Sequence, residues 1–300
     1  MRSIAQMREK VLSGSRKTIA VAAAEDMPVL EAIKDAIEAG LADAILVGNK
    51  EKIKTDLDKL GLSAEQIEIV DEPDVKRAAA KAVSFVRDGK AQVLMKGLLG
   101  TADFLRAVLN KENGLRTGDE LTHVAVFQVP QIDRLIMMTD SAMHTYPELN
   151  EKVKMLAAVK KVSNALEIPC PKVAAVCAVE VVNPAMQPTL DAALLAKMCE
   201  RGQIKGMVVD GPLALDIALN QEAADHKGVT GMVAGKADAL LMPNIESGNI
   251  MWKTLVYMAN AEIAGSIVGA AAPIVLTSRS DSPSTKLNSI MLALLMAEDL

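Results

Sequence analysis

The sequence contains few aromatic residues, and this scarcity excludes one class of function. Aromatic side chains make up 2% of the 300 residues, and the formal net charge is −5. A protein that binds single-stranded nucleic acid needs aromatic rings on which the bases stack. A phosphate backbone also calls for a basic surface. We therefore expect no nucleic-acid partner.

Cysteine and long apolar runs are also scarce. Cys170, Cys177 and Cys199 form no CxxC pair and are odd in number, as expected for reduced, packing thiols in a cytosolic protein. The apolar run at 263–276 is shorter than the ~20 residues of a membrane-spanning helix. The first apolar run, at 19–24, is too short for a secretory signal and is preceded by charges. We expect a cytoplasmic location and no membrane partner.

The sequence lacks the common motifs of nucleotide, metal and serine-nucleophile chemistry. It contains no GxGxxG, no GxxxxGK[ST] and no GxSxG. Its three histidines, His123, His144 and His226, are scattered and have no metal-ligand spacing. We therefore predict no metal site and no cofactor, and the chemistry that remains is the positioning of anions.

Short apolar runs alternate with segments of helical periodicity along most of the chain, in which 50% of residues are hydrophobic. This rhythm predicts an α/β fold with parallel-rich sheets flanked by helices. The expected strands are 17–26, 42–49, 67–72, 92–97, 172–179, 205–211 and 238–244. The expected helices are 27–40, 50–60, 73–87, 102–109, 147–166, 187–201 and 213–223.

The rhythm changes near the middle of the chain. Segments 122–129 and 134–140 are separated by four residues, too few for a helix, so we expect antiparallel strands. We predict two α/β lobes around a cleft: residues 1–145 plus 278–300 in the first lobe, and residues 146–277 in the second. The first lobe includes the C-terminal helix, predicted at 284–297.

Four polar segments fall at the junctions between strands and helices. In open parallel sheets, ligands collect at the carboxyl ends of strands, where helix N-termini also point. The residues of each segment could instead serve only the fold. Gly97 could make a tight turn, Asp210 could bond loop amides, and Ser247 or Asn249 could cap a helix. The four are "MKGLLGTADFLR" (95–106), "VDGPLALD" (209–216), "VAGKADALLMPNIESGN" (233–249) and "TSRSDSPSTK" (277–286).

The segment at 277–286 is the strongest candidate for an anion site. Ser282 followed by Pro283 predicts a helix cap and a proline in the first turn. Capping does not explain Arg279, which stands among hydroxyl side chains just before the expected helix. A guanidinium in this position suits the bidentate geometry of phosphate, and the helix dipole adds to the attraction.

At these four junctions the sequence resembles the phosphate acetyl/butyryltransferase family, in order and over nearly the whole chain. The segments that carry the resemblance are "LMKGLLGTADFLRAVL" (94–109), "DGPLALDIAL" (210–219), "VAGKADALLMPNIESGN" (233–249) and "LTSRSDSPSTKLNSI" (276–290). The resemblance implies a two-lobed fold of the isocitrate/isopropylmalate dehydrogenase type, with the active site in the cleft between the lobes. It also implies a homo-oligomer, a dimer or larger.

The resemblance further implies a reversible reaction in which acyl-CoA and phosphate give acyl phosphate and CoA. Ser278 and Arg279 match the family's Ser-Arg pair, and Arg106 matches a helix arginine that contacts an anionic substrate. Ser278 and Arg279 are the expected catalytic residues. The expected residues that bind phosphate or CoA are Gly97, Thr101, Arg106, Asp210, Lys236, Glu246, Asn249, Thr285 and Lys286.

One departure from the acetyl-handling members affects the expected substrate. These members carry, seven residues after the serine, an aspartate proposed to deprotonate the CoA thiol, whereas this sequence has Thr285 followed by Lys286. Either another group takes the thiol proton, or Lys286 helps to hold a thiolate. The form "SRSDSPSTK" is closer to the butyryl branch, so we expect longer or branched acyl chains.

Three other functions remain open at this point. The first is a phosphate acetyltransferase. The second is a metal- and NAD-dependent dehydrogenase of 2-hydroxy acids with the same fold, which would need a cluster of aspartates. Asp210 and Asp216, six residues apart, form no tight pair on one helix face. The third is a non-catalytic module that binds CoA or a nucleotide.

Overall fold

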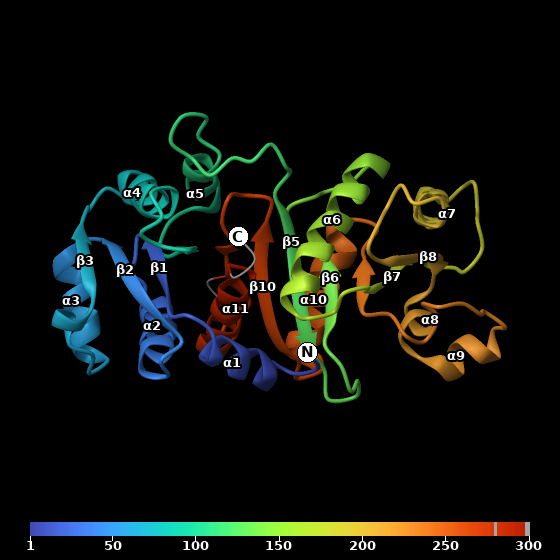
Figure 1. The fold of residues 1–300 in the computed structure, drawn as a ribbon, viewed down its shortest axis with the longest axis horizontal. Helices are drawn as coiled ribbons and strands as arrows, with labels where there is room; N and C mark the ends of the chain where they lie inside the picture. The colour runs from blue at the N-terminus through green and yellow to red at the C-terminus, as the bar shows by residue number, and fades with distance from the viewer. Residues whose placement is uncertain (279–280, 298–300) are drawn as a thin grey trace. The chain divides into compact units, whose positions relative to one another are not determined.

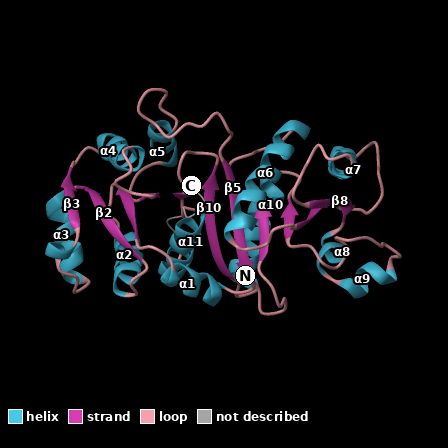
Figure 2. Ribbon diagram, in the orientation of Figure 1, coloured by secondary structure: helices cyan, strands magenta, loops and turns pink. Residues whose placement is uncertain are grey.

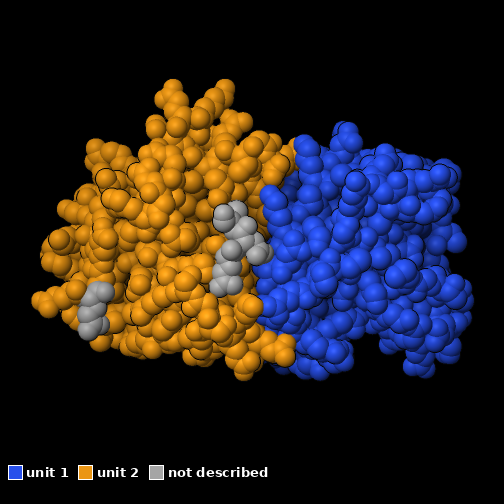
Figure 3. Space-filling model, viewed as in Figure 1, with its two compact units in different colours: residues 1–3, 122–263 blue, residues 4–121, 264–300 orange. Residues whose placement is uncertain are grey.

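The computed structural model describes residues 1–278 and 281–297, except the side chain of Gln66. The chain divides into two compact units (Figure 3). Unit 1 comprises Met1–Ser3 and Thr122–Ile263, and unit 2 comprises Ile4–Leu121 and Ala264–Leu300. Each unit contains both helices and strands, as predicted for an α/β protein (Figure 2).

Unit 2 has the strand order β3-β2-β1-β4-β11-β10, and its sheet is mostly parallel. Strand β1 runs parallel to β2 and β4, and β4 runs parallel to β11, while β10 and β11 are antiparallel. The strands are β1 (Lys17–Ala22), β2 (Ala42–Gly48), β3 (Glu68–Asp71), β4 (Val93–Lys96), β10 (Glu262–Val268, from Ala264 on in unit 2) and β11 (Ile274–Val275). The helices are α1 (Ile4–Ser13), α2 (Met27–Glu38), α3 (Lys50–Lys59), α4 (Val75–Arg87), α5 (Thr101–Val108) and α11 (Pro283–Met296), with a 3₁₀ turn η1 (Ala64–Gln66).

Helix α11 joins the two ends of the sequence in unit 2. It packs against α1, α2 and β11, and Figure 1 shows it, in red, beside the blue N-terminal helices. The apolar stripe of α2, formed by Val29, Leu30 and Ile33, is buried as its 3.6-residue period predicts. The predicted grouping of the C-terminal helix with the N-terminal strands therefore agrees with the packing of α11.

Unit 1 has the strand order β5-β6-β9-β7-β8. Strands β5 and β6 are antiparallel, as their short connection predicts, and β6, β9, β7 and β8 are parallel. The strands are β5 (Thr122–Gln128), β6 (Ile136–Thr139), β7 (Lys172–Val176), β8 (Val208–Leu213) and β9 (Ala239–Leu241). The helices are α6 (Leu149–Ala165), α7 (Gln187–Glu200), α8 (Leu215–Leu219), α9 (Gln221–His226) and α10 (Ile245–Met258).

The core of unit 1 shows how α8 and α10 are held on the sheet. Trp252 of α10 lies edge-on to Phe127 of β5, with ring centroids 5.7 Å apart, and Ile217 of α8 belongs to the same buried cluster. Edge-to-face aromatic pairs of this kind add ~0.5–1.5 kcal/mol to the burial of their apolar area. Trp252 and Phe127 are thus used in packing the core of unit 1.

The unit boundaries differ from the predicted ones near 145 and 278. Strand β6 pairs with β9, so the antiparallel pair 122–139 belongs with the later strands. Strand β11 pairs with β4, so the segment from 264 onward belongs with the N-terminal strands. Apolar periodicity identifies strands but not their partners, and the partners decide the division.

Three helix predictions need correction. The helix expected at 213–223 is two helices, because Asn220 ends α8 and caps α9, where its side chain accepts a hydrogen bond from the Ala223 amide. Helix α10 is capped by Asn244, not by Ser247 or Asn249. Helix α1 (Ile4–Ser13) was not among the predicted helices.

Within the described residues, no helix is both long and apolar enough to span a bilayer.

Candidate active site

Three helices of unit 2 begin at the ends of adjacent parallel strands. The strands β1, β4 and β11 end at Ala22, Lys96 and Val275, and lead into α2, α5 and α11 respectively. We call the connecting segments 23–26, 97–100 and 276–282 the carboxyl edge of unit 2, of which residues 279 and 280 lie outside the described residues. Helix N-termini at such an edge present unbonded amides and a positive dipole end to an anion.

Gly97 is required by the close approach of two strand ends. Its amide donates to the carbonyl oxygen of Ala22 at 2.8 Å, and the amide of Leu98 donates to that of Ala23 at 2.7 Å. A Cβ atom at position 97 would lie 2.1 Å from the Ala23 oxygen, a distance that no side chain tolerates. The predicted tight turn at Gly97 is confirmed, and it fixes the path of the chain into α5.

Helix α5 begins without a capping side chain. Its N-cap residue is Gly100, so no side-chain oxygen accepts a hydrogen bond from the first-turn amides. Thr101, the first helical residue, is exposed there. Arg106, one turn further on, is exposed and forms an ion pair with Asp103. The start of α5 thus offers amides and a hydroxyl group, which are suitable donors to a phosphate oxygen.

Helix α11 begins with a dense set of hydroxyl groups. The Ser282 hydroxyl caps the helix by accepting from the Thr285 amide at 3.1 Å, as predicted from the Ser-Pro pair. The same hydroxyl lies 2.8 Å from the Ser284 hydroxyl and donates to Thr285 Oγ1 at 3.1 Å. Ser278, before the helix, is exposed, and its amide donates to the carboxylate of Asp281 at 2.7 Å.

Lys286 is buried beneath this segment, with 1% of its surface exposed. Its Nζ donates to the carbonyl oxygens of Ser278 at 2.9 Å and Asp281 at 2.8 Å. Burial lowers the pKa of Lys286, and the charges of Asp281 and Asp26 oppose that shift. The prediction that Lys286 contacts a substrate stays untested, but its ammonium group already bonds the main chain.

Lys96 has the same environment at the neighbouring segment, and the sequence reasoning missed it. It is 6% exposed, and its Nζ donates to the carbonyl oxygens of Gly97 and Leu99, at 3.1 Å in both cases. The available signal was a single lysine at the end of the apolar strand "VLMK". Two buried ammonium groups therefore lie at the ends of adjacent segments of the carboxyl edge.

Arg279, predicted as a catalytic residue, lies outside the described residues. Its expected role rests on the sequence alone and stays a prediction. Ser278, the described member of the predicted pair, lies at the carboxyl edge of unit 2.

In unit 1, Glu246 and Asn249 lie in the first turns of α10, beside the segment that follows β6. Asn249 Nδ2 donates to the Ser141 carbonyl oxygen at 3.2 Å. The Tyr146 hydroxyl donates to the Glu246 carboxylate, and this hydrogen bond raises the pKa of Tyr146. Both Tyr146 and Glu246 are exposed, so the pair offers a polar surface at this strand end.

Asp210 and Lys236, the other predicted residues of unit 1, lie in different parts of the sheet. Asp210 is part of β8, and its Oδ1 accepts from the amide of the next strand residue, Gly211, at 2.8 Å, rather than from a loop amide. Lys236 is exposed and comes just before β9, whereas Glu246 follows the end of the same strand. The fold therefore does not bring Lys236 and Glu246 together.

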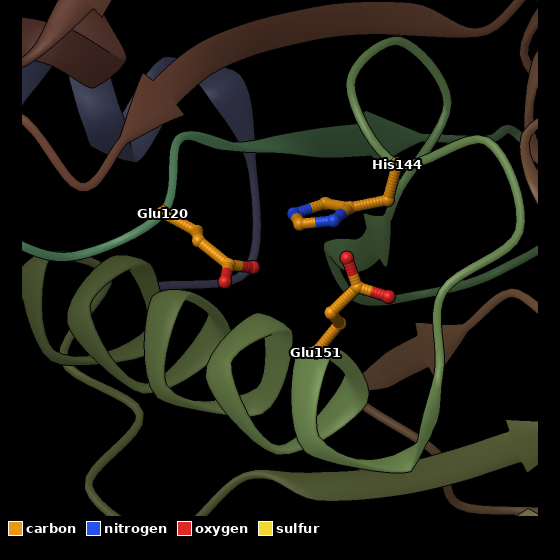
Figure 4. Close-up of side chains that lie close together, drawn as sticks. All are labelled: Glu120, His144 and Glu151. Atoms are coloured by element: carbon orange, nitrogen blue, oxygen red, sulfur yellow. The ribbon is translucent and has the colours of Figure 1, made fainter.

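Figure 4 draws His144 and Glu151 together with Glu120. The first two belong to unit 1, where Thr122 Oγ1 lies 3.1 Å from His144 Nε2, and Glu120 belongs to unit 2. One imidazole and one carboxylate from the same unit are fewer than the ligands a protein metal site provides.

The three cysteines form no disulfide. Burial raises the pKa of Cys177 to about 11, so its thiol is protonated at neutral pH and is no nucleophile. Cys170 is exposed, so the expectation that all three thiols pack in the interior is wrong for this residue.

Comparison with known proteins identifies the family of this chain. The family model described as phosphate acetyl/butaryl transferase matches residues 3–81 and 72–294. The chain belongs to this family. It is 58% identical over 297 residues to a phosphate butyryltransferase of Clostridium acetobutylicum, an alignment that covers 99% of each chain. The predicted resemblance and the predicted enzyme class, an acyltransferase, are confirmed.

Solved structures agree with the predicted fold. A branched-chain phosphotransacylase from Enterococcus faecalis V583 matches with a TM-score of 0.85 and 31% identity, over 94% of this chain and 99% of that one. A 4-hydroxythreonine-4-phosphate dehydrogenase from Klebsiella pneumoniae matches with a TM-score of 0.59 and 14% identity, over 94% and 99% of the two chains. The second match shows a dehydrogenase-like fold and nothing about activity. The expected dehydrogenase fold is confirmed for this acyltransferase, and the position of its site in a cleft between lobes stays a prediction.

Proposed function

We propose that this acyltransferase exchanges a butyryl or branched short acyl group between CoA and phosphate. Acyl-CoA and phosphate are the substrates of the family. The names of two similar proteins, a phosphate butyryltransferase and a branched-chain phosphotransacylase, support the longer or branched chain. So does Thr285, which replaces the aspartate of acetyl-handling members.

One structural observation supports the proposal most directly. In unit 2, α5 and α11 begin at the ends of the adjacent strands β4 and β11, and Ser278 lies exposed between β11 and α11. A phosphate dianion at this edge receives hydrogen bonds from the uncapped amides of α5. Arg279 contributes a guanidinium that binds two oxygens at once. The anion is thereby held and oriented before it reacts.

In the proposed reaction, a phosphate oxygen attacks the thioester carbonyl carbon. A tetrahedral oxyanion forms and then collapses, which breaks the carbon–sulfur bond and releases the CoA thiolate, to be protonated afterwards. The Ser278 hydroxyl donates a hydrogen bond to the charge that develops on the oxyanion or the sulfur. Hydrogen bonds that strengthen in the transition state raise kcat rather than lower KM.

The remaining predicted residues are assigned to binding phosphate or CoA. At the carboxyl edge of unit 2, Gly97, Thr101 and Thr285 are assigned to phosphate, and Arg106, in the last turn of α5, to an anionic group of a substrate. Asp210, Glu246 and Asn249 of unit 1 are assigned to CoA, together with Lys236, which lies apart from them. Each of these assignments is a proposal that substitution can test.

The reaction changes no oxidation state, so we propose that it uses no redox cofactor. We also propose that it needs no metal ion, because the charge of the phosphate is met by Arg279 and helix amides. A homo-oligomer in the cytoplasm completes the proposal, as the resemblance to the family implies.

The proposal is tested by CoA release from a panel of acyl-CoAs with and without phosphate. Release should depend on phosphate, survive a chelator, and be faster with butyryl- or isobutyryl-CoA than with acetyl-CoA, as judged by kcat/KM. Two methylene groups in an apolar pocket are worth ~1–3 kcal/mol each. A higher kcat/KM for acetyl-CoA would instead identify a phosphate acetyltransferase, and NAD reduction without CoA release would contradict acyl transfer altogether.

A further inference from the structure

Lys286 combines nearly complete burial with hydrogen bonds to main-chain oxygens. Burying an ammonium group costs free energy unless its donors are satisfied. Here two of its three donors are used by the carbonyl oxygens of Ser278 and Asp281, at 2.9 and 2.8 Å. Both acceptors belong to the segment that carries the predicted Ser-Arg pair.

The two ends of this segment are also bonded to each other. The Ser278 amide donates to the Asp281 carboxylate at 2.7 Å, and the Asp281 amide donates to the Ser278 carbonyl oxygen at 3.2 Å. With the two bonds from Lys286, four hydrogen bonds fix the main chain at Ser278 and Asp281. The main chain is therefore held at Ser278 and at Asp281.

The helix that carries Lys286 is closely packed in unit 2. The lysine lies in the first turns of α11, whose residues from Asn288 to Met296 are all buried. One turn on, the Ser289 hydroxyl donates to the Thr285 carbonyl oxygen at 2.8 Å and accepts from the Gly265 amide of β10 at 3.0 Å. The helix is thus bonded to the sheet, and the Lys286 ammonium group bonds this helix to the segment before it.

We propose that Lys286 is a positioning residue, which holds the main chain at Ser278 and Asp281 so that the Ser278 hydroxyl meets the reacting groups in the productive geometry. The role rests on the proposed function of this edge. Lys286 acts through other residues and does not hold the CoA thiolate, because two of its donors are occupied and 1% of its surface is exposed. In the neighbouring segment, the buried ammonium group of Lys96 likewise donates to two main-chain carbonyl oxygens, those of Gly97 and Leu99.

The central variant is Lys286→Met, which keeps the length and the apolar stem but removes the donors and the charge. A small misplacement of reacting groups can lower a rate ~10²-fold, so kcat/KM for phosphate should fall by about that factor. Ser289→Ala is the matched control, since it removes one hydrogen bond between the sheet and the same helix, which its buried residues 288–296 still hold in place. It should lower Tm and leave kcat and both KM values unchanged.

A second variant tests the shared role of the two ends. Asp281→Ala removes the carboxylate that accepts from the Ser278 amide. If Lys286 and Asp281 hold one segment, the losses in kcat from the two substitutions should not add in the double variant. This cycle also stands if Lys286→Met folds poorly, because Lys286→Gln, which retains one N–H donor group, can replace it and should show a smaller loss.

A third measurement separates positioning from direct support of the thiolate. In the direction of acyl-CoA synthesis, thiol analogues of CoA with different thiol pKa values are compared in the wild type and in Lys286→Met. A positioning residue slows all thiols by the same factor, whereas an ammonium on the sulfur changes the dependence on thiol pKa. A changed dependence overturns the proposal, and so does wild-type kcat in Lys286→Met. Absence of phosphate-dependent CoA release in the wild type would instead overturn the proposed function.

Discussion

Two buried lysines, one in each unit, show different uses of an ammonium group. Lys152 of unit 1, 4% exposed, joins α6 to α7 through an ion pair with Asp191, with Nζ and Oδ2 2.5 Å apart. Asp191 is held further by Gln187, whose Nε2 donates to Oδ1 at 2.9 Å. Lys286 of unit 2, 1% exposed, instead donates to main-chain carbonyl oxygens of the segment before α11.

This difference indicates which lysine stabilises the fold and which one serves the reaction. The pair of Lys152 and Asp191 links two regular helices, so its loss should affect folding and leave chemistry intact. Lys286 links a helix to the segment with the predicted catalytic pair, so its loss should affect chemistry more than folding. Substitutions at Lys152 and in the segment before α11 test this contrast.

Lys152→Met should lower the free energy of unfolding by ~3–5 kcal/mol, because it leaves the Asp191 carboxylate buried without its partner. Urea denaturation followed by circular dichroism measures the loss. Activity per folded molecule should stay at the wild-type value. The double variant Lys152→Met/Asp191→Leu should regain most of the stability, and a single-variant loss below about 1 kcal/mol would contradict the structural role.

Ser278→Ala should lower kcat ~10²–10³-fold, because the hydroxyl acts on charge that develops only in the transition state. The KM values for phosphate and acyl-CoA should change little, and so should the urea midpoint. Ser284→Ala, which removes another exposed hydroxyl of the same region, is the control and should retain kcat. Unchanged kcat in Ser278→Ala would exclude this serine from the chemistry.

Arg279→Lys should raise the KM for phosphate and lower kcat by at least about 10-fold although the charge is kept. A lysine is a point charge and cannot reproduce the two parallel hydrogen bonds of a guanidinium. Steady-state kinetics with phosphate as the varied substrate measure the effect. If both parameters stay at wild-type values, the phosphate site lies elsewhere.

Ser282→Ala should destabilise the protein by ~1 kcal/mol, since the hydroxyl caps α11 by accepting from the Thr285 amide. The change in the urea midpoint reports this loss. Ser282→Asp supplies another capping oxygen and should restore the midpoint. A midpoint for Ser282→Ala equal to that of the wild type would show that the cap contributes nothing to stability.

Much of the fold follows from the sequence because the sheet is rich in parallel strands. Buried parallel strands such as β1 and β2 read as short apolar runs, and amphipathic helices such as α2 follow them with a clear period. The unit boundaries do not follow in the same way. They depend on the pairing of β6 with β9 and of β11 with β4, which no local pattern specifies.

In the candidate site, too, only the features with a local sequence signal could be predicted. Ser278, Gly97 and Thr101 could be predicted because hydroxyls and glycines at strand ends have a local meaning. The bonding of Lys96 and Lys286 could not, since a lysine in an apolar context gives no sign of its acceptors. Both bond carbonyl oxygens, and every residue type carries a carbonyl oxygen, so only the three-dimensional structure identifies these partners.

We assign to the carboxyl edge of unit 2 the transfer of an acyl group from CoA to phosphate. The most direct measurement follows CoA release from butyryl-CoA and traps the acyl phosphate as its hydroxamate, in the presence of EDTA. We expect one acyl phosphate for each CoA released, and no release without phosphate. CoA released without acyl phosphate, or activity that EDTA abolishes and a divalent cation restores, would contradict it.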